Sequence, residues 1–116
     1  MQYMLLIYDN EARKLSPAEQ GRLMQEYMAF TQSIVKSGNF KAGDPLERTS
    51  TASTVRVRDG KTAITDGPFA ETKEQLGGYY IVEAKDLDEA TAIAARVPSA
   101  RTGSIEVRPI LKMGER

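Results

Sequence analysis

The chain has 116 residues, and its 16 lysines and arginines balance its 16 aspartates and glutamates, giving a formal net charge of zero. This length predicts a single domain over residues 1–116, and the neutral charge argues against a nucleic-acid partner, since such proteins usually carry a basic excess. Cysteine and histidine are both absent, which excludes disulfides, zinc–thiolate sites and a histidine general base. We expect no metal and no cofactor, so acid–base chemistry falls to carboxylates, tyrosines or lysines.

The first quarter of the chain predicts a strand followed by a helix. Residues 2–8 read QYMLLIY and are apolar on both alternating faces, which is typical of a strand covered on both sides. This run is too short to cross a bilayer and has no basic segment before it, so we expect a cytoplasmic protein with no membrane partner. Residues 16–19, SPAE, form a capping box with proline at the first helical position. Apolar residues at helical spacing follow up to the stop at Ser37-Gly38.

The remaining elements complete a ferredoxin-like plan. A short strand from residue 39 ends in the turn Asp44-Pro45, and residues 54–65 predict a hairpin with a type I′ turn at Asp59-Gly60. An apolar strand at 79–84, a helix capped by Asp86 and a last strand at 104–111 follow. Without the hairpin the order is βαββαβ, so we predict an α+β ferredoxin-like fold with an inserted β-hairpin.

Two helices can cover only one face of such a sheet. Apolar residues on the other face need a different cover, and a second copy of the chain would provide it most simply. We therefore expect a face-to-face homodimer, and the zero net charge is compatible with self-association.

The stretch TDGPFAETKEQLGGYY at residues 65–80 has two interpretations. In the first it is a structural connection: Asp66-Gly67 makes a turn, Phe69 plugs the core, and residues 70–76 form one or two helical turns before the glycine pair. In the second it is the wall of a pocket between this loop, the sheet and the first helix, because long ordered connections often carry function.

Five side chains are the candidate site residues in the second interpretation. A carboxylate beside a lysine can act as a general base if burial raises its pKa, and a tyrosine next to another tyrosine on a strand points to the opposite face. An arginine on the last strand can clamp a substrate carboxylate or form a structural ion pair. The candidates are Asp66, Lys73 and Tyr79 as catalytic residues, and Arg108 and Glu71 as substrate-binding residues.

Other charged groups fit plainer roles. The basic residues of the hairpin, Arg56, Arg58 and Lys61, fit a solvated outer face, since a nucleic-acid patch needs more basic residues and exposed aromatics. Residues 9–11, DNE, fit a solvated acidic loop, and the carboxylates from Asp86 onward fit helix capping.

The segment TDGPFAETKEQLGGYYIVEAKDLDEA, with MLLIY near the start and GSIEVRPI near the end, resembles the signature of the DGPF, or YCII-related, domain family. The resemblance covers nearly the whole chain and implies a dimeric α/β-barrel fold. More distant YciI-like relatives have been suggested to be enzymes because a histidine and an aspartate meet in a pocket. Glu26 or Tyr27 falls near the place of that histidine, so the dyad is absent. The resemblance also implies an association with a sigma factor, since some DGPF proteins lie beside or are fused to one.

Three functions stay open from the sequence. The first is a cofactor-free enzyme that performs a proton transfer, isomerisation or lyase step on a small polar organic molecule. The second is a non-catalytic module that senses a small ligand or binds a protein such as a sigma factor. The third is a purely structural dimer. Fold alone does not decide among them.

Overall fold

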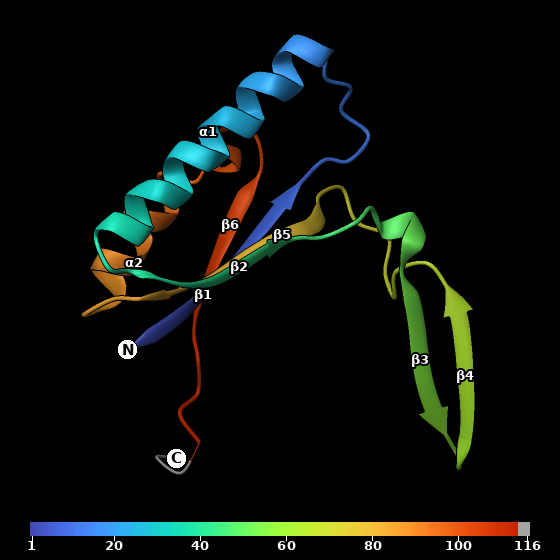
Figure 1. Ribbon diagram of the computed structural model, residues 1–116. Helices are drawn as coiled ribbons and strands as arrows, with labels where there is room; N and C mark the ends of the chain where they lie inside the picture. Colours follow the sequence, from blue (N-terminus) through green and yellow to red (C-terminus); the bar gives the residue numbers. More distant parts are fainter. Residues whose placement is uncertain (114–116) are drawn as a thin grey trace.

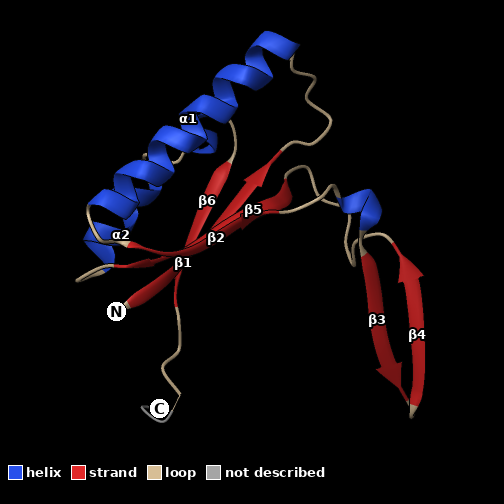
Figure 2. Ribbon diagram, in the orientation of Figure 1, coloured by secondary structure: helices blue, strands red, loops and turns tan. Residues whose placement is uncertain are grey.

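The computed structural model describes residues 1–113 and has a four-stranded antiparallel sheet with a separate hairpin (Figure 1, Figure 2). The strand order in the sheet is β2-β5-β1-β6, which is the ferredoxin-like arrangement predicted from the element order. The helices and strands are β1 (Gln2–Asp9), α1 (Pro17–Lys36), β2 (Phe40–Pro45), β3 (Ser53–Arg58), β4 (Lys61–Asp66), β5 (Gln75–Glu83), α2 (Leu87–Ala94) and β6 (Ser104–Pro109), with short 3₁₀ helices η1 (Thr49–Thr51) and η2 (Pro98–Arg101).

The capping box predicted for α1 is present. The Ser16 hydroxyl accepts a hydrogen bond from the backbone N–H of Glu19, and the Glu19 carboxylate accepts one from the backbone N–H of Ser16. The bond from the Ser16 N–H to the Glu19 carboxylate holds the pKa of Glu19 below its usual value, because it favours the ionised form. No helix within residues 1–113 combines the length and the apolar character needed to cross a membrane.

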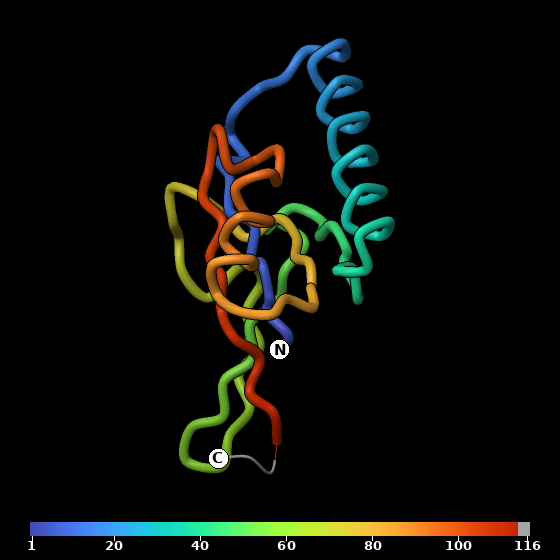
Figure 3. Tube along the Cα trace, turned by 90° about the vertical axis from the view of Figure 1, so that its left-hand side faces the viewer, coloured from blue at the N-terminus to red at the C-terminus, as the bar shows by residue number. Residues whose placement is uncertain are grey.

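The core lies between the sheet and the two helices, which cover one face of the sheet (Figure 1, Figure 3). Alternate residues of β1 and β5 point into it, so Leu5 and Val82 are fully buried beside Ile34 of α1. Tyr80 is also buried; its ring meets the ring of Phe30 edge-on at 5.2 Å, and its hydroxyl lies 2.6 Å from the hydroxyl of Thr31.

No helix covers the other face of the sheet in the described part of the chain. The register pairs Met4 with Ile81 and Leu6 with Tyr79, so these four half-buried side chains share that face at its centre. We call this surface the open face. The expectation that two helices leave half of the sheet bare is confirmed for the protomer.

The hairpin formed by β3 and β4 stands apart from the sheet (Figure 1). Its turn residues Asp59 and Gly60 have φ values of 51° and 73°, as a type I′ turn requires. At its base the N–H of Gly67 donates to the carbonyl of Ala52 at 2.7 Å, so the chain enters and leaves the hairpin at neighbouring points.

Two expectations about residues 65–80 are wrong. Phe69 does not plug the core, because its side chain is 78 % exposed in the protomer. Residues 70–76 form bends rather than helical turns, and β5 already begins at Gln75. The Thr72 hydroxyl donates to the backbone carbonyl of Glu74 at 2.6 Å, and the side-chain amide of Gln75 donates to the backbone carbonyl of Thr72. Such local bonds compete with the helical pattern.

Candidate functional site

The structure does not bring the five candidate residues together. Tyr79 and Arg108 lie on the open face, whereas α1 covers the opposite face of the sheet. These two side chains and the first helix therefore cannot line the same cleft. Asp66 ends the hairpin, and Glu71 and Lys73 lie in the loop that follows; all three side chains are exposed. Within residues 1–113 of the protomer, these side chains therefore do not line one pocket between the loop, the sheet and the first helix.

Tyr79 has a specific partner on the open face. Its hydroxyl donates a hydrogen bond to Oδ2 of Asp44 on β2 at 2.7 Å. This bond raises the pKa of the Tyr79 phenol, because the donated proton is held by a negative charge. Arg108 lies two strands away, where its Nε is 3.8 Å from Oε2 of Glu106 and its side chain is largely exposed. Tyr79 and Arg108 thus share a face without touching the same partner.

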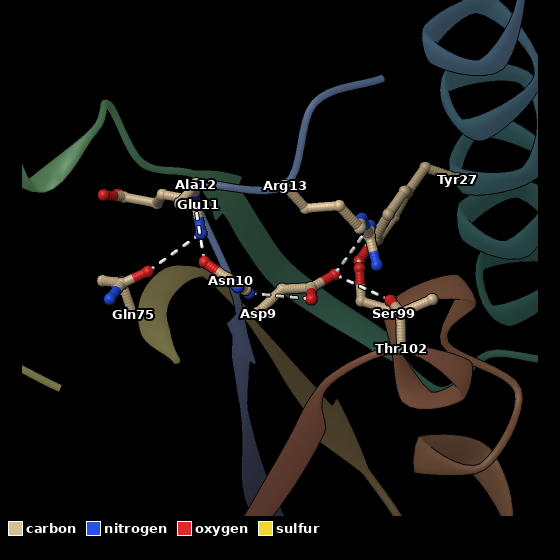
Figure 4. A network of polar contacts seen from close by, with 9 residues as sticks. All are labelled: Asp9, Asn10, Glu11, Ala12, Arg13, Tyr27, Gln75, Ser99 and Thr102. Carbon is tan, nitrogen blue, oxygen red and sulfur yellow. Dashed lines mark hydrogen bonds and ion pairs between the residues drawn. The ribbon is translucent and has the colours of Figure 1, made fainter. Parts of the chain in front are cut away.

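A connected group of polar side chains lies at the carboxyl end of β1, between α1 and η2 (Figure 4). Asp9 is its centre: Oδ2 accepts bonds from Arg13 at 3.2 Å and from the Thr102 hydroxyl at 2.8 Å. Oδ1 accepts a bond from the N–H of Asn10 at 2.8 Å. The Asp9 side chain is 22 % exposed and that of Arg13 is 34 % exposed, so this ion pair sits in a partly closed setting.

Tyr27 of α1 and Ser99 of η2 complete this group, which we call the Asp9 cluster (Asp9, Arg13, Tyr27, Ser99 and Thr102). Their hydroxyl oxygens lie 2.6 Å apart, and Ser99 is buried. Burial raises the pKa of the Tyr27 phenol, and the negative charge of nearby Asp9 adds to the effect, although the Ser99 bond opposes it. The phenol therefore stays protonated at neutral pH and can act as a hydrogen-bond donor.

Gly103 explains how the loop before β6 reaches Asp9. A Cβ atom at this position would lie 2.0 Å from the carbonyl oxygen of Tyr8 and 2.9 Å from the Cα atom of Asp9. Only glycine lets the two backbones approach this closely. The close approach places Thr102 within hydrogen-bonding distance of Asp9.

Glu11 ties the same loop to the base of the hairpin. Its carboxylate accepts bonds from the N–H of Thr49 at 2.9 Å and from the Thr49 hydroxyl at 2.7 Å, and these bonds lower the pKa of Glu11. Its own N–H donates to the side-chain oxygen of Gln75 at 2.9 Å. Residues 9–11 are therefore a hydrogen-bonded junction, and the interpretation as a freely solvated acidic loop is wrong for Asp9 and Glu11.

No group of three or more acidic side chains within residues 1–113 is arranged to hold a metal ion. The Asp9 cluster contains one carboxylate, one guanidinium and three hydroxyl groups, so its chemistry is acid–base and hydrogen-bonding chemistry. A carboxylate can accept a proton, a protonated phenol can donate one, and the guanidinium can hold an anionic oxygen.

Sequence reasoning missed Asp9 and Tyr27 as partners. The sequence places Tyr27 in the apolar row of the first helix and near the place of the family histidine, and it places Asp9 in a loop, but it does not bring the two together. Of the two residues near the place of the family histidine, Tyr27 points into the cluster, whereas Glu26 forms a surface ion pair with Arg101 at 2.7 Å. The available signal was the polar residue that directly follows a buried strand.

Tyr27→Phe is expected to change how stability depends on pH. The folded state holds the Tyr27 proton more tightly than the unfolded state, whose pKa is near the ordinary value of 10.0. The resulting stability is fully present below that value and falls as pH rises above it. Urea denaturation measures the free energy of unfolding of both proteins at about pH 8 and about pH 11. Between these two pH values we expect this free energy to fall less for Tyr27→Phe than for the native chain. Equal losses would contradict the buried protonated phenol.

The fold and the cluster define a small α+β protein of the ferredoxin-like, dimeric α/β-barrel class with polar side chains at one end of its sheet. The YCII-related domain model matches residues 1–114, and the chain belongs to this family. The chain is 40 % identical over 114 residues to an uncharacterized protein of Rhizobium meliloti (strain 1021), covering 95 % of this chain and 92 % of that protein.

A solved structure shares the fold. It is the 5-chloro-2-hydroxyhydroquinone dehydrochlorinase of Burkholderia phenoliruptrix in complex with 2,5-dihydroxybenzoquinone, with a TM-score of 0.55 and 15 % sequence identity. The likeness covers 96 % of this chain and 94 % of that one. At this identity it establishes the fold, and it supports the predicted fold class.

Proposed function

We propose that the protein is a cofactor-free enzyme that transfers protons to and from a small polar organic molecule at the Asp9 cluster. The observation that carries the proposal is the partly closed Asp9 carboxylate, which is paired with the Arg13 guanidinium and whose negative charge acts on the pKa of the Tyr27 phenol. A base, a protonated acid and a fixed positive charge are the groups that such a reaction needs.

Each group has a distinct role in the proposed step. Asp9 takes a proton from a carbon next to a carbonyl, and the electron pair of the broken C–H bond forms an enolate. Arg13 and Tyr27 donate hydrogen bonds to the oxygen on which that charge develops. Return of a proton to another carbon gives an isomerisation, and loss of a leaving group from the neighbouring carbon gives a lyase-type elimination.

The substrate class follows from these donors and acceptors. A ring or short chain with a carbonyl next to a hydroxyl group offers one oxygen to Arg13 and Tyr27 and one O–H or C–H to Asp9. The ligand named in the dehydrochlorinase structure, 2,5-dihydroxybenzoquinone, has this pattern. It is therefore a suitable first probe.

The test is exchange of the ring C–H of 2,5-dihydroxybenzoquinone in D₂O, followed by proton NMR. At each exchange a deuteron adds to the ring carbon and the original proton leaves it to the base, so the probe is unchanged except for the isotope. We expect the protein to accelerate exchange over buffer, and Asp9→Asn to reduce that acceleration at least about tenfold.

Asp66→Asn is the matched control. It makes the same change at the exposed carboxylate that the sequence analysis named as a candidate catalytic residue. It is expected to leave exchange unchanged. Loss of exchange in Asp66→Asn alone would move the site to the hairpin base. Binding of the probe without any exchange, measured by thermal shift, would favour the ligand-sensing function instead.

A further inference from the structure

An open hollow lies between α1 and the segment that runs from the end of α2 through η2. Its volume is about 320 Å³, at the lower end of the range for small-molecule sites, roughly 300–1,000 Å³. It shares no residue with the Asp9 cluster. Its lining combines apolar side chains with two guanidinium groups and one carboxylate: Glu26, Ala29, Phe30, Arg96, Pro98 and Arg101.

Contacts with α1 fix the guanidinium group of Arg96. Its Cζ atom lies 5.6 Å from the ring centroid of Phe30, and one of its nitrogens donates to the hydroxyl oxygen of Ser33. The Ser33 hydroxyl in turn donates to the backbone carbonyl of Phe30 at 2.7 Å. The ring attracts the cation above its face. Arg96 is therefore positioned before a ligand arrives, which lowers the entropic cost of binding.

The hollow has an excess of positive charge. Arg101 pairs with Glu26, since one of its nitrogens is 2.7 Å from Oε2 of that carboxylate. Arg96 forms no ion pair within residues 1–113. Two guanidinium groups and one carboxylate thus leave one positive charge without a counter-charge in the lining. A guanidinium group has five N–H donors, and each of these arginines uses only one nitrogen in the contacts above.

We propose that this hollow binds a small organic carboxylate, with its anionic group on Arg96 and Arg101 and its apolar body against Ala29 and Pro98. Arginine matches the planar carboxylate group and binds it through parallel N–H bonds. One carboxylate supplies the single negative charge that the lining lacks, whereas a phosphate monoester carries roughly two. The existing Glu26–Arg101 pair shows that a carboxylate oxygen fits against Arg101.

Benzoate and benzamide test the need for charge, because they share a ring and a planar head group but only benzoate is an anion. Two-dimensional ¹H–¹⁵N NMR at constant ionic strength follows the binding of each probe to the native chain. We expect benzoate to shift the backbone amide signals of Ala29, Arg96 and Arg101. The dissociation constant of benzamide should be at least about tenfold higher, and inorganic phosphate should also bind more weakly than benzoate.

Arg96→Gln tests the guanidinium group that lacks an ion-pair partner in the lining. Arg56→Gln is its matched control at an exposed arginine of the hairpin. Both side chains lie at the surface, so both variants are expected to fold, as judged by circular dichroism. The dissociation constant of benzoate should rise at least about tenfold for Arg96→Gln and stay unchanged for Arg56→Gln.

Glu26→Gln should change the affinity in the opposite direction. It removes the carboxylate that occupies Arg101 and repels an incoming anion, so the dissociation constant of benzoate should fall at least about threefold. Several results would overturn the proposal: equal affinity for benzoate and benzamide, equal affinity of Arg96→Gln and Arg56→Gln, or weaker binding by Glu26→Gln. Signal shifts confined to Arg13 and Thr102, or tighter binding of phosphate than of benzoate, would overturn it too.

Discussion

Gly103→Ala is expected to destabilise the protein by on the order of 3 kcal/mol or more. The added Cβ atom would lie 2.0 Å from the Tyr8 carbonyl oxygen, and a backbone atom cannot rotate away as a flexible side chain can. The loop before β6 must then withdraw from β1, which separates Thr102 from Asp9. We therefore expect two quantities to fall together in this variant: the free energy of unfolding, and the rate at which the protein exchanges the C–H of 2,5-dihydroxybenzoquinone.

Two matched variants separate backbone contact from side-chain contact. Thr102→Ala removes the hydroxyl that donates to Asp9 but leaves the backbone in place, and should cost about 1–2 kcal/mol. Gly21→Ala makes the same change as Gly103→Ala inside α1, where nothing lies within 4 Å of the new Cβ atom, and should stabilise by about 0.5–1 kcal/mol. Urea denaturation of the three variants measures the differences. A Gly103→Ala cost no larger than that of Thr102→Ala would contradict the close backbone approach.

The elements that the sequence predicted well are those with local causes. The capping box of α1 needs only residues 16–19, and the type I′ turn needs only Asp59-Gly60. The alternation in β1 and β5 separated Tyr80, which is buried, from Tyr79, which lies on the open face. Because these features depend on neighbours in the chain, a single sequence is enough to predict them.

The Asp9 cluster was not predictable in the same way. It joins the end of β1, the middle of α1 and the η2 turn, and Asp9 and Thr102 are 93 positions apart. Gly103 permits that contact, yet nothing in its sequence neighbours indicates which backbone it approaches. The prediction for residues 66–74 was wrong for the opposite reason: Asp66, Glu71 and Lys73 suggested a pocket wall, but the single chain leaves these three side chains exposed.

The Asp9 cluster and the hairpin meet at one junction. Glu11 follows Asp9 closely in the chain and bonds to Thr49 in η1, which leads into the hairpin of β3 and β4. This junction links the base of the hairpin to the loop that carries Asp9. Variants of the hairpin should therefore also be assayed for exchange of the probe C–H.

Leu5→Ala is expected to cost about 3–5 kcal/mol, because Leu5 is fully buried between the sheet and the helices and its truncation leaves a cavity. Leu6→Ala removes the same atoms from the next residue, which points to the open face and is half-buried in the protomer. Its cost to the isolated chain should be about 1 kcal/mol. The pair thus compares the two faces of one strand.

Protein concentration separates the effects of these two variants. The Leu5→Ala loss should appear at every concentration, since the core is complete within one chain. The Leu6→Ala loss should grow with concentration, because a dimer interface contributes to stability only where dimers form. Urea denaturation at about 1 µM and about 100 µM measures both. A Leu6→Ala loss that stays small and independent of concentration, in a chain shown to be dimeric, would mean that the dimer leaves the open face bare.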